Sequence, residues 1–298
     1  MNFNQNSRFD PTFKNNSMLI RLIYANIAVF VGIKVLYLLF WLIQANGSPA
    51  EWVTNWLAVP SGVTTLLTRP WTVVSYMFLH LDFFHIFSNM LWLYFLGQLF
   101  VEFIGEKKLW TVYIAGGIAG AALYVVFFNI FPAFTNIAPY SKALGASASV
   151  MAVVVAVGTY APDFSIRLLF FGNVKLKFIA IFSVVLDIIS ISDSNSGGHI
   201  AHLGGAALGF FFAKKWKEGK DITAWVDTST NYLTAIFSSS KKPKIKVKHR
   251  KSHNEYEYNA RKKEEQQVVD DILDKISRSG YDSLSKKEKD ILFNASGK

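Results

Sequence analysis

Apolar residues are distributed very unevenly along this chain of 298 residues. They form long blocks before residue 214, and few follow it. A membrane-spanning helix needs about 20 largely apolar residues, with roughly 17 to 25 tolerated. In addition, 51% of the chain is hydrophobic and only 17% is charged, which is little charge for a soluble domain. The distribution therefore predicts a membrane core followed by a soluble tail.

The apolar blocks predict six membrane-spanning helices. Three blocks are long enough to cross a bilayer, and three are short and need surrounding helices or local thinning of the membrane. The long blocks are residues 18–43, 84–104 and 109–131, and the short ones are residues 144–160, 178–191 and 199–212. The predicted fold class is an all-α, polytopic bundle of six transmembrane helices with a small cytoplasmic helical tail.

Lysine and arginine indicate how this bundle is oriented. Short loops rich in these residues stay in the cytoplasm. With six spans, Lys107, Lys108 and the basic tail lie on the same side as the N-terminus, whereas the opposite loops hold few positive charges. The N-terminus is polar and lacks a signal-peptide cleavage pattern. We therefore expect a multi-pass protein of the cell membrane with both termini cytoplasmic.

The composition divides the chain into four predicted regions. They are a polar cytoplasmic N-terminus (1–17), a six-helix membrane domain (18–213), a basic juxtamembrane linker (214–253) and a cytoplasmic helical hairpin (254–298). In the hairpin, Gly280 fits a helix stop, and Ser285 with Glu288 fits a capping box. The net charge of +10 indicates contact with membrane lipids rather than nucleic acid. The partner of the tail is not indicated.

Three polar clusters stand out within the apolar blocks. Polar residues in a membrane are costly, so they usually mark a functional site. The clusters are His85–Asn89, Gly145–Ser149 and His199–Gly205, and they open the second, fourth and sixth predicted helices. These even-numbered helices all enter from the outer face. The three clusters should therefore meet at one depth, just below that face.

The residue types in these clusters fit acyl transfer. A serine nucleophile needs a base to take its proton, and histidine is the usual one. Ser147 at a helix N-terminus also has backbone N–H groups nearby, which favour a developing oxyanion. His85 and Asn89 are one helical turn apart and could add side-chain donors to the same hole.

Small residues make a close approach of the helices possible. Ala201, Gly205 and Gly209 form a stripe on the sixth helix, a pattern typical of tight helix packing in lipid. Such packing would bring His202 within hydrogen-bond reach of Ser147.

A metal site is the main alternative interpretation of the histidines. The HExxH motif of zinc proteases is absent, and six histidines are too few for a di-iron membrane oxygenase. The lack of cysteine excludes thiolate ligands. The sequence therefore predicts no metal and no cofactor. A Ser–His dyad would suffice, and Asp187, in the fifth predicted helix, stays open as a third member.

Four motifs follow one another in the membrane domain. They are Arg69-Pro70-Trp71-Thr72 leading to Phe78-Leu79-His80, then His85-x-x-x-Asn89-Met90, then Gly145-x-Ser147, and finally His202-Leu203-Gly204-Gly205-x-x-x-Gly209. Their order and spacing resemble the rhomboid family of intramembrane serine proteases, over roughly residues 18–213.

This resemblance implies a role for each matching residue. Ser147 would be the nucleophile and His202 the base, while His85, Asn89 and the amide of Ser147 would form the oxyanion hole. It also implies structural roles for four residues: Glu102, Gly145, Gly205 and Gly209. It gives no role to His199.

Two residues depart from the family pattern. The usual motif is GxSG, and Ala148 replaces its second glycine. An aromatic residue often follows the serine by one turn and stacks on the base, but Met151 occupies that position. The histidine must therefore be oriented in some other way.

The predicted function is that of an intramembrane serine endopeptidase. It would cleave transmembrane segments of other membrane proteins near the outer face. The alternative is a rhomboid-like pseudoenzyme that binds such segments without cleaving them. Because Ser147 and His202 are both present, the protease is favoured.

Overall fold

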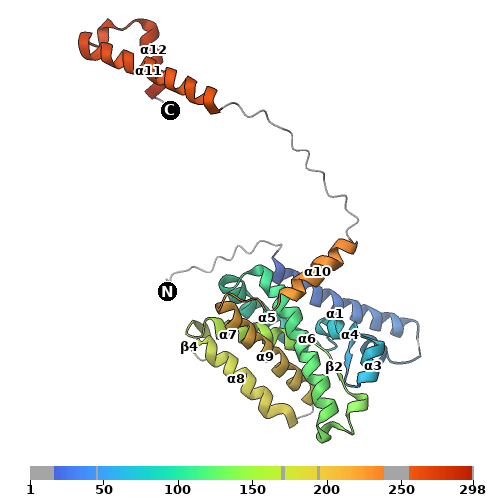
Figure 1. The fold of residues 1–298 in the computed structure, drawn as a ribbon. Coiled ribbons are helices and arrows are strands. Elements are labelled where there is room, and N and C mark those ends of the chain that lie inside the picture. Colours follow the sequence, from blue (N-terminus) through green and yellow to red (C-terminus); the bar gives the residue numbers. More distant parts are fainter. Residues whose placement is uncertain (1–16, 45, 169–171, 193–194, 238–254, 297–298) are drawn as a thin grey trace. The chain divides into compact units, whose positions relative to one another are not determined.

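A computed structural model of the chain describes residues 17–44, 46–168, 172–192, 195–237 and 255–296. The protein is mostly helical and divides into two compact units, residues 1–238 and 239–298 (Figure 1). The first unit contains the predicted membrane domain, and the second contains the predicted hairpin. The polar N-terminus up to residue 16 and the basic run at residues 241–251 lie outside the described residues.

The first unit is built around six helices, which lie where the apolar blocks predicted them. They are α1 (Met18–Leu42), α5 (Phe83–Phe103), α6 (Glu106–Ile130), α7 (Ser147–Tyr160), α8 (Leu176–Ile189) and α9 (Ser196–Lys217). Among the described residues, α1, α5 and α6 are long and apolar enough to cross a membrane. The other three do not meet that criterion; α7 and α8 have 14 residues each. At 1.5 Å per residue they extend about 21 Å, less than the hydrocarbon core.

Short elements connect these helices. Between α1 and α5 lie α2 (Pro49–Leu57), β1 (Val59–Pro60), α3 (Val63–Thr68), α4 (Thr72–Ser75) and η1 (Tyr76–Phe78), and between α6 and α7 lie η2 (Pro132–Phe134), η3 (Ala138–Tyr140) and β2 (Lys142–Ala143). The hairpin of β3 (Ser165–Leu168) and β4 (Gly172–Lys175) joins α7 to α8, and η4 (Ser190–Ser192) precedes α9. Antiparallel pairing of β1 with β2 holds the α1–α5 connection beside the chain leading into α7.

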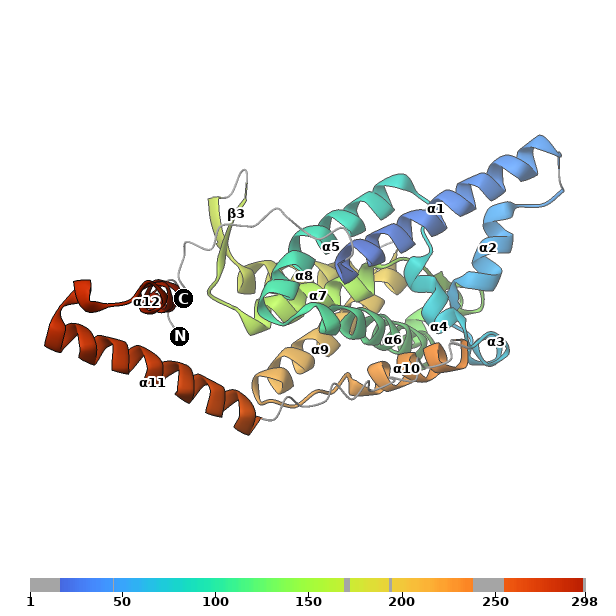
Figure 2. The same ribbon diagram turned by 90° about the horizontal axis from the view of Figure 1, so that it is seen from above.

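Helix α7 lies in the middle of the unit, in contact with α5, α6, α8 and α9 (Figures 1 and 2). Its contact with α9 is close because a Cβ on Gly205 would come within 2.0 Å of the Ala148 carbonyl oxygen. A Cβ on Gly209 would likewise come within 2.2 Å of the Ala152 carbonyl oxygen. Only glycine permits this approach of two backbones, as the small-residue stripe predicted. Because neighbouring helices enclose α7, this helix can be shorter than the hydrocarbon core is thick.

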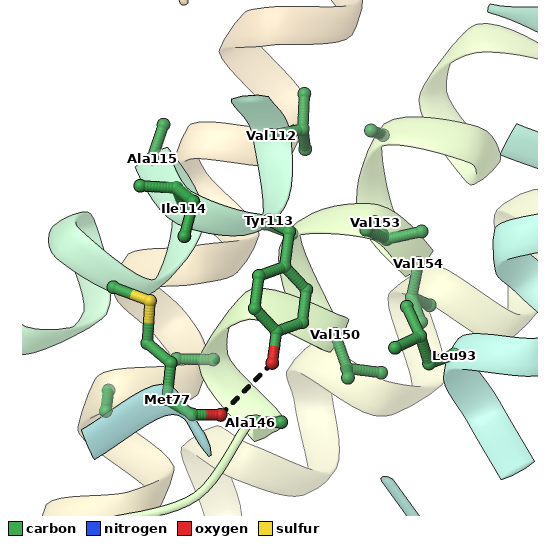
Figure 3. Close-up of a cluster of buried hydrophobic side chains, with 14 of the residues drawn as sticks. Met77, Leu93, Val112, Tyr113, Ile114, Ala115, Ala146, Val150, Val153 and Val154 are labelled. Atoms are coloured by element: carbon green, nitrogen blue, oxygen red, sulfur yellow. Dashed lines mark hydrogen bonds between the residues drawn. The ribbon is translucent and has the colours of Figure 1, made fainter. Parts of the chain in front are cut away.

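Buried hydrogen bonds fasten the connection before α5 onto α6. The hydroxyl of Tyr113, a fully buried residue of α6, donates to the carbonyl oxygen of Met77 over 3.1 Å (Figure 3). That hydroxyl also accepts from the side-chain amide of Asn26 in α1, at 3.1 Å. Tyr76 donates in the same way to the carbonyl of Gly117, at 2.5 Å. Hydrogen bonds between membrane helices contribute about 0.6 kcal/mol each on average, so they orient the connection more than they stabilise it.

Part of the predicted linker is helical and attached to the membrane domain. Helix α9 continues to Lys217, and α10 (Ala224–Phe237) follows it. The Lys108 ammonium lies 2.6 Å from Asp221 and 2.5 Å from Asp227. The indole of Trp110 donates to Thr230 over 3.3 Å. The segment from Asp221 to Thr230 is therefore held against α6, which its composition alone did not indicate.

The second unit contains α11 (Glu255–Ser279), the turn η5 (Tyr281–Ser283) and α12 (Lys286–Ser296). Gly280 ends α11 with a φ of +75°, a backbone conformation that favours glycine. The Ser285 amide donates to the Glu288 carboxylate over 2.6 Å, and the Glu288 amide donates to Ser285 Oγ over 3.4 Å. This is the reciprocal capping box that the sequence predicted.

Candidate active site

A cavity of about 740 Å³ is lined by residues from all three polar clusters. The clusters lie at the beginnings of α5, α7 and α9, and the end of α8 closes the cavity from another side. The polar side chains in its lining include those of His85, Asn89, Ser147, Asp187, His199 and His202. The three clusters thus meet in one place, as their shared depth predicted.

Ser147 is the first residue of α7, and the chain reaches it through Gly145. Gly145 has a φ of +116°, and its amide donates to the Tyr76 carbonyl oxygen over 2.9 Å. A Cβ on Gly145 would come within 2.7 Å of the His85 ring. Glycine is therefore required both by the backbone conformation and by the approach of His85. The arrangement brings Ser147 and His85 to the same cavity.

Asp187 orients His202 directly. The Nδ1 atom of His202 lies 2.8 Å from Oδ1 of Asp187, whose side chain is only 7% exposed. An ionised carboxylate can only accept hydrogen bonds, so Nδ1 carries the hydrogen and Nε2 is left as an acceptor. That is the tautomer a histidine needs to remove a proton from serine. The contact also orients the expected base, although Met151 replaces the aromatic residue.

Ser147 and His202 line the same cavity. Among the described residues, no hydrogen bond joins Ser147 Oγ to His202. Such catalytic bonds are often long before substrate binds and shorten only in the complex. The neighbouring Ser149 is fully buried and lies outside the lining of the cavity.

His80 holds two groups beside the expected oxyanion hole, and the sequence had assigned it no role. It is fully buried, and its Nδ1 lies 3.4 Å from the Phe78 carbonyl oxygen, which makes Nε2 the acceptor. Nε2 then accepts from the Ala146 amide at 3.3 Å and from the side-chain amide of Asn89 at 3.2 Å. In the sequence, only the position of His80 in the Phe78-Leu79-His80 motif indicated that it matters.

Asn89 has both of its amide hydrogens engaged. One is donated to His80 and the other to the His85 carbonyl oxygen, at 3.0 Å. An amide nitrogen has two hydrogens, so Asn89 must exchange a partner before it can donate to an oxyanion. His85 has its ring against the His80 ring, with centroids 5.0 Å apart.

His199 shares the carboxylate that orients His202. Its Nδ1 lies 2.8 Å from the same Oδ1 of Asp187, and its side chain is 23% exposed. The other carboxylate oxygen, Oδ2, is buried and has no hydrogen-bond partner among the described residues. The sequence had no role for His199, because its distance from Asp187 depends on how α8 packs against α9.

Glu102 is exposed at the end of α5 and makes no hydrogen bond or ion pair among the described residues. The nearby Glu106 instead accepts from the backbone amide of Met18 at the start of α1. The proposed structural role of Glu102 thus gains no support from its contacts.

The methyl group of Ala148 lies against Gly120 of α6. A Cβ placed on Gly120 would come within 2.6 Å of the Ala148 Cβ, so the glycine makes room for it. The carbonyl oxygen of Ala148 lies against Gly205 of α9. The departure from GxSG is thus accommodated by Gly120.

Replacement of Ala148 by glycine should therefore leave the cleavage rate within about twofold of wild type. It should lower stability by about 0.5 to 1 kcal/mol, because glycine gains more backbone freedom on unfolding. Turnover of a transmembrane substrate and the melting temperature in detergent check both parts. A large gain in turnover would show that the methyl group does strain the contact between α7 and α9.

Comparison with protein families identifies the part of the chain that builds the cavity. A family model described as the rhomboid domain matches residues 67–216, which is half of the chain. The chain belongs to the rhomboid family. The match spans the elements from the end of α3 to the end of α9, which include every residue of the cavity. Residues 254–298 match a family of unknown function (DUF6576).

Rhomboid-like proteins are also found among curated relatives. RHOMBOID-like protein 12, mitochondrial, of Arabidopsis thaliana is 30% identical over 158 residues, covering 50% of this chain and 47% of the relative. Presenilin-associated rhomboid-like protein, mitochondrial, is 26% identical over 167 residues in both Bos taurus and Homo sapiens. Those matches cover 52% of this chain, and 42% and 41% of the relatives. The chain thus spans less than half the length of the curated relatives it matches.

These relatives contradict the expected location in the cell membrane. All of them are named as mitochondrial proteins. The prediction rested on the distribution of lysine and arginine, which reports the sidedness of a bilayer and carries no information on which membrane it is. The placement in the cell membrane is therefore wrong.

Proposed function

We propose that this rhomboid is an active intramembrane serine endopeptidase that cleaves transmembrane segments of other proteins. The observation that carries the proposal is the pair of Asp187 and His202, 2.8 Å apart, in a cavity that Ser147 also lines. A buried carboxylate at Nδ1 fixes the tautomer in which Nε2 of His202 can accept a proton. The names of the relatives favour a mitochondrial membrane as its location.

In the proposed reaction, Ser147 Oγ attacks the carbonyl carbon of the scissile peptide bond. His202 Nε2 takes the serine proton, and Asp187 stabilises the imidazolium that forms. The same proton then passes to the nitrogen of the leaving amine as the C–N bond breaks. Water, deprotonated by His202, hydrolyses the resulting acyl-enzyme. No cofactor takes part in these steps.

The oxyanion would be stabilised by the Ser147 amide and by side chains across the cavity. The first amides of a helix lack intrahelical partners and lie at the positive end of its dipole. His85 lies against Gly145, close to where the oxyanion would form. Asn89 would join by giving up one of its two present acceptors. Its contribution would therefore be smaller than that of the Ser147 amide.

All six helices would cross the membrane, although α7, α8 and α9 are short or less apolar. Because α7 is enclosed by α5, α6, α8 and α9, it needs little contact with lipid. The cavity would then lie near the face at which α5, α7 and α9 begin. The chain has no cysteine, so single cysteines introduced at Asn136 and Lys220 can be labelled selectively. Labelling from the same side of the membrane would contradict six crossings.

Reaction with a fluorophosphonate probe tests the proposed activity, because the probe labels only activated serines. The purified wild-type protein should be labelled, and Ser147→Ala should not be. The control Ser149→Ala should be labelled like wild type, since Ser149 lies outside the cavity lining. Absence of labelling in the wild type would favour the pseudoenzyme that binds transmembrane segments without cleaving them.

A further inference from the structure

Three potential metal ligands meet at one point of the cavity. They are Asp187 of α8 and the two histidines of α9, His199 and His202. Each can offer one ligand atom, and these atoms all lie within 4.8 Å of one another. Two imidazoles and a carboxylate form a ligand set that suits zinc and related transition metals. Of these three residues, the proposed protease chemistry uses Asp187 and His202 and gives His199 no role.

A second observation also points to a ligand at this position. Asp187 is only 5% exposed, and its Oδ2 atom has no hydrogen-bond partner among the described residues. A buried carboxylate oxygen without a partner is costly. Oδ1 meanwhile serves two imidazole groups at 2.8 Å each. A cation between the three side chains would engage this carboxylate together with both Nδ1 atoms. The side chains of His199 and His202 are 23% and 19% exposed, so an ion can reach the cluster from the cavity.

We propose that Asp187, His199 and His202 form a binding site for Zn²⁺ or a similar divalent transition metal, and that occupation of this site switches the protease off. The binding step stands on the ligand geometry alone. The inhibition rests on the proposed function, because it requires His202 to be the catalytic base.

The tautomer of His202 explains why the metal would inhibit. In the protease form, Nδ1 carries the hydrogen and Nε2 is free to accept a proton from Ser147. A metal bound to Nδ1 takes the lone pair of that atom, so the hydrogen of the neutral ring must move to Nε2. His202 then has no free lone pair and cannot act as a base. The metal also draws Asp187 away from the imidazolium it would stabilise.

The selectivity of the site follows from its ligands. Mg²⁺ and Ca²⁺ prefer oxygen ligands and should bind poorly to two imidazoles and one carboxylate. Three protein ligands leave a fourth tetrahedral position for water. Lys142 is a further charged residue in the cavity lining, but its ammonium donates to Asn55 over 2.5 Å.

Calorimetric titration of ZnCl₂ into detergent-solubilised Ser147→Ala protein tests binding without any need for activity. We expect one site of micromolar affinity, with no heat of binding from MgCl₂ at the same concentrations. Adding His199→Gln should weaken zinc binding at least tenfold, whereas His199→Cys, which supplies a thiolate ligand, should retain it. Adding His253→Gln in the tail serves as the matched control and should change nothing. Equal zinc affinity with and without His199→Gln would overturn the site.

Cleavage assays then test the inhibition. Zinc should stop cleavage by the wild type, and EDTA should restore it. For His199→Gln, the zinc concentration that halves the rate should rise at least tenfold, measured against the metal-free rate of the same variant. Zinc binding without inhibition of an active wild type would overturn the regulatory part. A wild type that cleaves nothing would refute the proposed function, while the calorimetric result would still decide the metal site.

Discussion

Substitution of Ser147 by alanine should abolish cleavage of a model transmembrane substrate. Loss of a serine nucleophile typically lowers kcat by about a millionfold. The histidine then has no hydroxyl to activate, and the oxyanion hole has no tetrahedral intermediate to stabilise. Stability should be nearly unchanged, since Ser147 borders an open cavity rather than the packed interior. Initial rates in proteoliposomes and melting curves in detergent measure the two effects.

Ser149→Ala is the matched control for this experiment. Ser149 is two residues further along α7 and fully buried, and its hydroxyl has no hydrogen-bond partner among the described residues. Removing an unpaired buried hydroxyl should cost no stability. The variant should therefore keep the wild-type rate. More than a few per cent of activity in Ser147→Ala would show that another group is the nucleophile.

Substitution of Asp187 by asparagine should have the second largest effect. We expect a loss of about 10³- to 10⁴-fold in kcat, because asparagine can stabilise the wrong tautomer of His202 and carries no charge to balance the imidazolium. The KM for the substrate should stay the same, since Asp187 acts through His202. A variant that merely disturbed the fold would change KM and melting temperature as well.

The kcat of Asp187→Asn distinguishes a triad from a dyad, and His202→Ala gives the rate expected when the base is lost. That variant should be as inactive as Ser147→Ala, and the double variant should be no worse, because the two residues act as one unit. If Asp187→Asn keeps more than a tenth of the wild-type kcat, the carboxylate does not take part. The dyad expected from the sequence would then be sufficient.

Several features of the fold follow from short stretches of sequence. The apolar blocks predicted where α1, α5, α6, α7, α8 and α9 lie. A helix that crosses a membrane needs a continuous apolar segment, and such a segment is visible in the sequence alone. Gly280, Ser285 and Glu288 predicted the end of α11 and the start of α12, because capping involves residues only three positions apart. The small connecting elements α2, α3, β1 and β2 were not predicted. Their residues are too few to carry a periodic pattern.

The sequence by itself determined that polar clusters would lie at one end of three helices, and that serine and histidine would be among them. Only the tertiary structure decided which atoms meet. Asp187 became the partner of His202 through the packing of α8 against α9, and His80 became an acceptor through the fastening of its connection onto α6. The methyl group of Ala148 turned toward Gly120 for the same kind of reason. Contacts between distant segments depend on how whole helices pack, and local residue patterns do not contain that information.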